Sequence, residues 1–140
     1  MALERNSEIF SDFSHALERL KESLREPLSK GDIVVDGVIQ RFEFTFELAW
    51  KLAQKALSYS GVNVNAPRFV IKEAFKAEIL KDGDRWIDML EDRNKTVHLY
   101  DEKSALEIYE KIKEDYYPLL EEFRADIINF LPGLTKNSHS

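Results

Sequence analysis

Apolar residues recur at steps of three and four along almost the whole chain, which is the spacing of an amphipathic α-helix. The first such series runs through Phe10, Phe13, Leu17, Leu20 and Leu24. It gives one helix an apolar stripe with which to join a core. Pro27, Gly31 and Asp32 then break the pattern and end this first helix.

The next stretch is the one place where two periodicities compete. Its alternating apolar residues, as in a half-buried strand, are Phe42, Phe44, Phe46 and Leu48. No turn residue separates them from residues 48–57, which are rich in helix formers. We therefore expect one helix from about Asp32 to about Ser60, with Gly61 as its C-terminal cap. The helix carries these aromatics and Trp50 on most of its sides, which is typical of a central helix with several neighbours, and all are expected in the core.

The rest of the chain continues the helical pattern. A third helix is expected from Pro67 to about Leu80, since proline suits the first turn of a helix. After a turn at residues 81–83, a shorter fourth helix is marked by Trp86, Met89, Leu90 and Val97. Asp101 is expected to cap a long last helix, whose apolar residues are Ala105, Tyr109, Ile112, Tyr116, Leu119, Phe123, Ile127 and Phe130. Pro118 lies inside this series and is expected to kink or cut the helix.

These helices predict an all-α protein, an up-and-down four-helix bundle with an additional short helix. The chain of 140 residues suffices for one domain with its own core. We place that domain at residues 1–131 and a flexible tail at 132–140. With 44% hydrophobic and 33% charged residues, a soluble globular protein is expected. No apolar stretch is long enough to cross a bilayer, and residues 1–12 lack a signal-peptide pattern, so the expected compartment is the cytoplasm.

Composition also excludes several classes of function. The chain has no cysteine, which removes disulfides, thiolate metal sites and a cysteine nucleophile. Its net charge is −6, whereas a general nucleic-acid coat is normally basic, so any RNA contact has to be local, transient or helped by a partner. The five glycines are scattered and form no phosphate-cradling loop. No Gly-Ser precedes a spaced pair of aspartates, so the chain is not expected to transfer nucleotides itself.

The segment Arg93–Tyr100 contains the most suggestive set of side chains. An arginine, a histidine and a tyrosine form an R-x4-H-x-Y array, with Asn94 directly after Arg93. Arginine binds phosphate through two N–H groups, and His98 can move a proton near neutral pH. Residues five apart on a helix point about 140° away from each other. Arg93 and His98 therefore converge only if the helix ends between them, near Val97, or if a second copy supplies the other half.

Structural interpretations compete with this chemistry. Arg93 could simply pair with Asp88 or Asp92. The carboxylates Asp88, Glu91 and Asp92 match no metal-binding spacing and are expected to form a solvated helix face. Elsewhere, Glu47 and Lys51 have the favourable order for an ion pair four residues apart.

Several blocks together resemble the nucleotidyltransferase substrate-binding protein family of the HEPN superfamily. The blocks are residues 41–51, Pro67-Arg68 with residues 71–75, residues 86–94, and His98-Leu99-Tyr100. They follow one another in order and cover the chain from about Asp36 to about Tyr117. The resemblance implies a helical bundle that dimerises, and a partner, a minimal nucleotidyltransferase encoded nearby.

The resemblance also implies an activity. Many HEPN proteins are metal-independent endoribonucleases that use an R-x4–6-H motif, so Arg93, Asn94 and His98 become the expected catalytic residues, with no cofactor and no metal. In toxin–antitoxin relatives the partner adenylylates the tyrosine two residues after the histidine, which here is Tyr100, and so silences the toxin. Two other interpretations stay open: a non-catalytic subunit that binds substrate for the nucleotidyltransferase, and a helical dimer whose site has decayed.

Overall fold

Helices dominate the part of the chain that a computed structural model describes, residues 2–96 and 101–134, and no strand occurs in those ranges. The all-α prediction is confirmed. The elements in order are α1 (Ala2–Leu24), a 3₁₀ turn η1 (Leu28–Lys30), α2 (Asp32–Tyr59), α3 (Pro67–Lys76), α4 (Gly83–Lys95), α5 (Glu102–Lys111), a π-helical turn η3 (Ile112–Tyr116) and α6 (Tyr117–Ile127).

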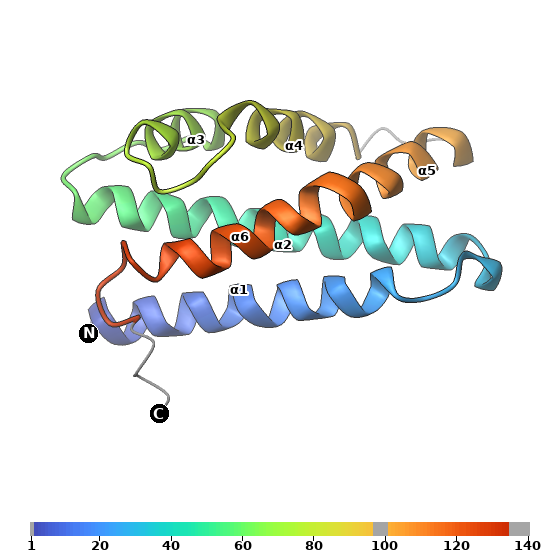
Figure 1. Cartoon of the computed structure of the whole chain (residues 1–140), viewed down its shortest axis with the longest axis horizontal. Coiled ribbons are helices and arrows are strands. Elements are labelled where there is room, and N and C mark those ends of the chain that lie inside the picture. The colour runs from blue at the N-terminus through green and yellow to red at the C-terminus, as the bar shows by residue number, and fades with distance from the viewer. Residues whose placement is uncertain (1, 97–100, 135–140) are drawn as a thin grey trace.

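The long helices lie side by side as an up-and-down bundle (Figure 1). Helix α2 returns antiparallel along α1, α3 and α4 lie on the side of α2 away from α1, and the α5–η3–α6 rod runs back across the bundle. Four main helices, with α3 as the additional short one, match the predicted architecture. Two contacts pair α3 with α4: Arg68 near the start of α3 reaches Glu91 at 3.4 Å, and Phe75 near its end packs against Gly83 at the start of α4.

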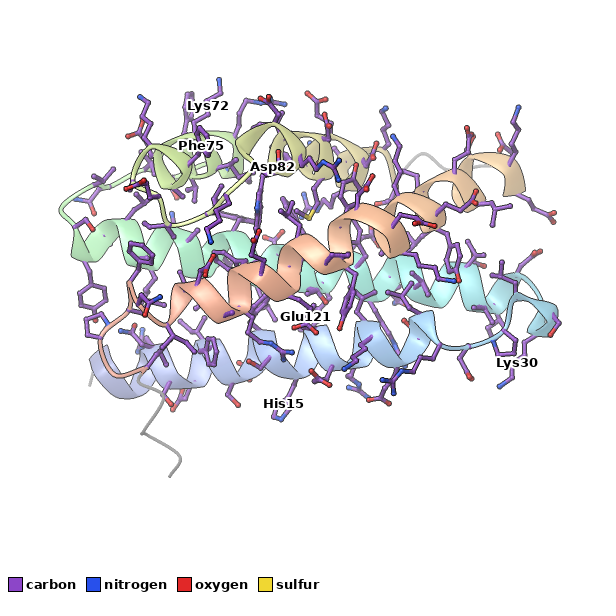
Figure 2. The ribbon with its side chains drawn as sticks, in the orientation of Figure 1. His15, Lys30, Lys72, Phe75, Asp82 and Glu121 are labelled. Atoms are coloured by element: carbon purple, nitrogen blue, oxygen red, sulfur yellow. The ribbon has the colours of Figure 1, made fainter. Side chains whose placement is uncertain are left out.

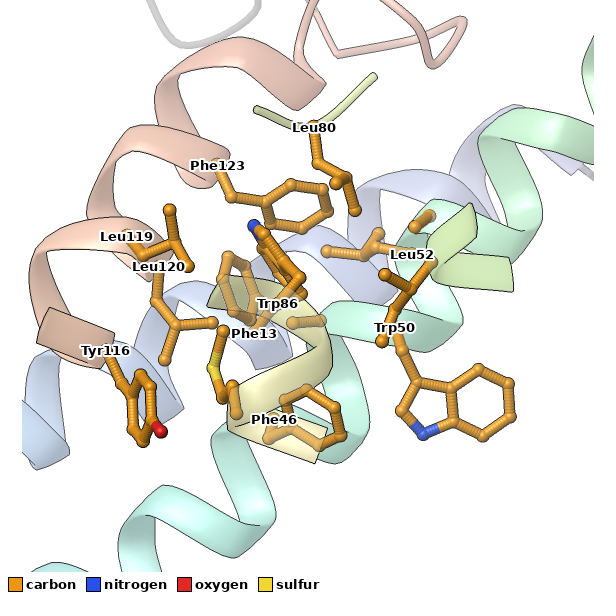
Figure 3. Packing of buried hydrophobic residues seen from close by; sticks show 14 of the residues in the cluster. Phe13, Phe46, Trp50, Leu52, Leu80, Trp86, Tyr116, Leu119, Leu120 and Phe123 are labelled. Carbon is orange, nitrogen blue, oxygen red and sulfur yellow. The ribbon is translucent and has the colours of Figure 1, made fainter. Parts of the chain in front are cut away.

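Each main helix contributes an aromatic ring to the centre of the core. Trp86 of α4 lies with its ring centroid 5.2 Å from that of Phe123 on α6 and 6.3 Å from that of Phe46 on α2. Phe13 of α1 completes the group at 5.7 Å from Phe123 (Figure 3). All four side chains are 0–2% exposed. Trp86 therefore contacts rings of α2 and α6, and Phe123 links this pair to Phe13 of α1.

The aromatics of α2 divide between the core and the surface. Phe42, Phe46 and Trp50 are buried, as predicted, but the core prediction for Phe44 is wrong, because its side chain is 61% exposed. Phe44 lies two residues from both Phe42 and Phe46, which is about 200° of rotation around a helix. A helix that buries its neighbours on either side therefore turns Phe44 outward.

Two helix ends illustrate how the chain turns. Gly61, with φ of 86°, follows α2 as predicted, and the Val62 N–H donates to the Leu57 carbonyl at 2.9 Å. Helix α3 ends at Lys76 rather than continuing to about Leu80. Glu78 adopts φ of 62°, and the Ile79 N–H donates to the Ala74 carbonyl at 2.8 Å. This early end turns Ile79 and Leu80 into the core.

The last helix is interrupted at Pro118, as expected. Proline has no N–H to donate to the preceding turn, and the chain forms the π-helical turn η3 directly before it, with Pro118 in the first turn of α6. Asp101 caps α5, since its carboxylate accepts a hydrogen bond of 2.6 Å from the Ser104 N–H. Both predictions from the sequence are confirmed.

The two ends of the described chain meet at one end of the bundle (Figure 1). The Asn6 side-chain amide donates to the Pro132 carbonyl at 3.0 Å. Leu131 and Leu134 are buried, 3% and 6% exposed. Buried residues thus extend as far as Leu134, and the domain boundary at residue 131 stays a prediction.

Candidate functional site

The C-terminal end of α4 carries the described part of the Arg93–Tyr100 array. The helix ends at Lys95, and Thr96 Oγ1 lies 2.6 Å from the Arg93 carbonyl oxygen. Helix α4 thus ends two residues after Arg93, and the convergence of Arg93 with His98 stays a prediction. The predicted site residues His98 and Tyr100 lie outside the described residues.

Two acidic residues of α2 fix this end of α4. The Arg93 guanidinium donates to the Glu47 carboxylate, and each of these side chains is 31% exposed. The Thr96 hydroxyl contacts the Glu43 carboxylate. Glu43 and Glu47 are four residues apart and so lie on the same face of α2. The end of α4 is therefore attached to α2 by two contacts, one turn apart.

The partner of Arg93 differs from the one expected. The sequence suggested Asp88 or Asp92, and both suggestions are wrong, because Arg93 lies on the side of α4 that faces α2. Glu47 also forms the predicted pair with Lys51, at 3.6 Å. The pairing of Glu47 with Arg93 was not predicted, because a contact between two helices cannot be read from the spacing of residues along one of them.

The Arg93 side chain is positioned and still accessible. A second N–H group, on Nη1, donates to the Asn94 side-chain oxygen at 3.2 Å. A guanidinium has five N–H donors, so the contacts with Glu47 and Asn94 leave donors for a further acceptor. The site thus combines a half-exposed cation with an amide that orients it, which is an arrangement that can bind a phosphate group.

Asp92 holds the opposite side of α4. The prediction of a solvated face is wrong for this residue, which is 4% exposed, whereas Asp88 and Glu91 are exposed. The Tyr116 hydroxyl donates to the Asp92 carboxylate, and Lys111 Nζ lies 3.3 Å from it. Helix α5 and η3 cover Asp92, a tertiary contact that charge patterning along one helix does not reveal. The end of α4 is therefore held between α2 and the α5–η3 rod.

Loss of the Asp92 carboxylate should destabilise the fold. In Asp92→Ala the buried Tyr116 hydroxyl loses its acceptor, so we expect the free energy of unfolding to fall by about 1–3 kcal/mol. Asp88→Ala, an exposed position one turn earlier on the same helix, is the matched control and should change it by less than about 0.5 kcal/mol. Urea denaturation measures both, and equal losses would show that the buried contact contributes nothing.

Tyr116 makes stability depend on alkaline pH. Burial, together with the hydrogen bond to Asp92, raises the pKa of the Tyr116 hydroxyl far above its ordinary value near 10. The unfolded chain then loses this proton first as the pH rises, so the stability contributed below about pH 10 declines above it. We expect a shallower decline in Tyr116→Phe, measured by urea denaturation between pH 8 and 11. An unchanged decline would contradict this assignment.

An acidic groove lies between α2 and α5, and Thr96 forms part of its lining. It has a volume of about 610 Å³. Val35, Ile39, Ala105 and Leu106 supply its apolar lining. The carboxylates along it are Asp32, Asp36, Glu43, Asp101 and Glu102. Five acidic side chains disfavour a phosphate on this side of the site.

Comparison with known proteins identifies the class of this helical bundle. A family model described as "Nucleotidyltransferase substrate binding protein like" matches residues 8–128, and the chain belongs to that family. "Probable ribonuclease HepT" of Haemophilus influenzae (strain ATCC 51907 / DSM 11121 / KW20 / Rd) is 30% identical over 94 residues. The match covers 64% of this chain and 64% of that relative, just under two thirds of its length.

Two solved structures share the fold. A crystal structure of a protein from Thermus thermophilus superposes with a TM-score of 0.74 at 33% identity, covering 82% of this chain and 98% of that one. A Haemophilus influenzae protein, described as revealing the fold of a substrate binding domain of a nucleotidyltransferase, gives a TM-score of 0.66 at 22% identity. That match covers 89% of this chain and 98% of the other and is a likeness of fold. Across the described ranges, none of the helices has the length and apolar character needed to span a membrane.

Proposed function

We propose that this protein is a metal-independent endoribonuclease, the toxin subunit of a two-component system, and that a minimal nucleotidyltransferase silences it by adenylylation. The observation that supports this most is the partly exposed Arg93, which Glu47 fixes in the last turn of α4, five residues before His98 in the sequence. The name of the Haemophilus influenzae relative, a probable ribonuclease, points to the same chemistry.

The residues divide the reaction between them. His98 acts as general base on the ribose 2′-hydroxyl or as general acid on the leaving oxygen. Arg93 stabilises the charge that develops on the phosphate as it becomes pentavalent. Asn94, whose oxygen accepts from Arg93, orients the guanidinium. A reaction that starts from the 2′-hydroxyl is restricted to RNA.

The active form is proposed to be a homodimer in the cytoplasm, with two copies of the array facing each other across the interface. This proposal rests on the family resemblance. Light scattering at micromolar protein should give twice the mass of the chain, and a monomer would count against a composite site.

RNA digestion in EDTA tests the proposed activity. We expect the isolated protein to cleave RNA in the presence of the chelator, since the proposed mechanism uses only side chains. The family description favours a second candidate, a non-catalytic subunit that binds substrate for the nucleotidyltransferase. If RNAs of varied sequence and structure all stay intact, that second candidate is the better one.

Tyr100 is the expected site of modification. It lies two residues after His98, and a transferred AMP would place a phosphate close to the Arg93 cation that RNA needs. Incubation with the partner nucleotidyltransferase, ATP and magnesium should add the mass of AMP to the peptide that contains Tyr100 and inhibit cleavage. Tyr100→Phe should remain unmodified and active. Modification of Tyr100→Phe to the same extent would contradict the assignment.

A further inference from the structure

The outward side of α3 carries a row of cations, although the protein as a whole is acidic. We call the α3 face the set Arg68, Phe69, Lys72, Phe75 and Lys76. The three cations follow one another at intervals of four residues, so they lie in a row along one side of the helix. Figure 2 shows Lys72 and Phe75 on the side of the bundle away from α1. The face thus places a row of positive charge on a chain with net charge −6.

Two phenylalanine rings flank this row of cations. Phe69 is 61% exposed and Phe75 is 51% exposed, although both are large apolar side chains. An exposed ring next to a cation offers a flat surface on which a nucleic-acid base can stack while its phosphate meets the charge. Successive cations are about 6 Å apart along the helix axis, close to the step between successive phosphates of an extended strand.

The cations of the α3 face are available to a phosphate. Lys72 forms no ion pair with any residue in the described ranges. Arg68 pairs with Glu91 and Lys76 with Glu73, but in both pairs the cationic side chain is well exposed, 44% and 73%. Exposed pairs of this kind are weak because water and salt screen them, so a polyanion can displace them.

The α3 face leads to the candidate site. Arg68 contacts Glu91 on α4, and Asn94 lies one turn beyond Glu91 on the same helix. From Asn94 the next contact is Arg93 itself. The groove that Thr96 helps to line, between α2 and α5, carries five carboxylates and repels phosphate. A strand that approaches Arg93 is therefore favoured from the side of α3.

We propose that the α3 face binds single-stranded RNA and delivers it to the site at Arg93, with phosphates on the cation row and bases stacked on Phe69 and Phe75. This inference rests on the proposed function, since it assigns the route by which the substrate reaches that site. The regular spacing of the cations, with a ring on either side, favours a strand that repeats phosphate and base.

Binding and cleavage are separated by the choice of RNA. A fluorescein-labelled 2′-O-methyl RNA strand of mixed sequence has no free 2′-hydroxyl to attack, so fluorescence anisotropy reports binding alone. Lys72→Gln/Lys76→Gln should raise Kd at least about tenfold at 0.1 M salt and reduce the slope of log K against log salt by about 1.4, at about 0.7 for each phosphate contact. The control Arg19→Gln/Arg25→Gln, which removes one exposed charge five residues before the end of α1 and one just beyond that end, should change neither value.

A second pair of variants tests stacking. Phe69→Leu keeps an apolar side chain but loses the ring, and we expect Kd to rise about fivefold or more. Phe44→Leu on α2 is the matched control, because Phe44 is also 61% exposed, and should leave Kd unchanged. Unchanged RNA binding in both α3 variants would overturn the inference. If the same variants instead weaken the complex with the nucleotidyltransferase, the α3 face is a protein-binding surface and the inference is likewise overturned.

Unmodified RNA distinguishes failure of the inference from failure of the proposed function. If the protein cleaves RNA, Lys72→Gln/Lys76→Gln should raise KM and leave kcat unchanged. Cleavage with an unchanged KM would refute the α3 route while the ribonuclease assignment stands. If wild-type protein binds the 2′-O-methyl strand through the α3 face but cleaves no RNA, the ribonuclease assignment fails and the RNA-binding face stands.

Discussion

Replacement of His98 by alanine is expected to lower the rate of RNA cleavage at least about a hundredfold, because general acid–base catalysis typically contributes about 10²–10⁴-fold. If His98 acts only in catalysis, the free energy of unfolding should change by less than about 0.5 kcal/mol, the range usual for surface substitutions. Cleavage in EDTA and urea denaturation measure the two quantities on the same samples. If cleavage survives the substitution, the mechanism is wrong even where the class of enzyme is right, and if the variant unfolds, His98 has a structural role.

Arg93→Lys provides a second test of the same site. Lysine keeps the charge but loses the planar set of donors that binds a phosphate through two N–H groups, so cleavage should be impaired. Arg85→Lys is the matched control on the same helix, since Arg85 pairs with Asp82 and Asp115 well before the last turn. The control should retain full activity. Equal activity of both variants would show that charge alone is needed at position 93.

Replacement of Trp86 by alanine should cause the largest loss of stability in the chain. Removal of a fully buried large aromatic side chain typically costs about 3–5 kcal/mol, a large share of the about 5–15 kcal/mol that stabilises a domain. Trp86 is 0% exposed and contacts rings from α2 and α6, so its loss leaves a cavity that several helices border. We expect the melting temperature to fall by about 10 °C or more.

The control for Trp86 is Phe44→Ala, which removes an aromatic ring that is 61% exposed and should change stability by less than about 0.5 kcal/mol. Trp86→Phe keeps a ring at the centre of the core and should lose less stability than Trp86→Ala. A loss in Trp86→Ala no greater than that in Phe44→Ala would contradict the central role given to Trp86.

Local patterns in the sequence were sufficient for most of the fold. The apolar spacing, Gly61, Asp101 and Pro118 predicted where helices begin, end and break, because each depends on residues close in sequence. Helix α3 was predicted too long because its end depends on burial of Ile79 and Leu80, which is a tertiary effect. Phe44 was wrongly predicted to be buried because all the aromatics of this run were assigned to the core together. Successive alternate residues are about 200° apart around a helix, so they cannot all face the same side.

The candidate site was predictable only in part. The array itself was visible because its residue types are adjacent in sequence. The contact of Arg93 with Glu47 joins residues 46 positions apart, and the contact of Tyr116 with Asp92 joins residues 24 apart. No spacing rule along one helix reports such pairs. The burial of Asp92 in particular reverses the expectation for a carboxylate that follows two exposed acids on the same helix.

The contact between Arg93 and Glu47 reduces the side-chain entropy that Arg93 can still lose when a ligand binds. A free arginine side chain loses about 1.5–2 kcal/mol of rotamer freedom when it is fixed on a phosphate. In this protein folding has already imposed that loss. If the site cleaves RNA as proposed, a guanidinium held in place before the ligand arrives lowers the entropic cost of positioning the phosphate for reaction.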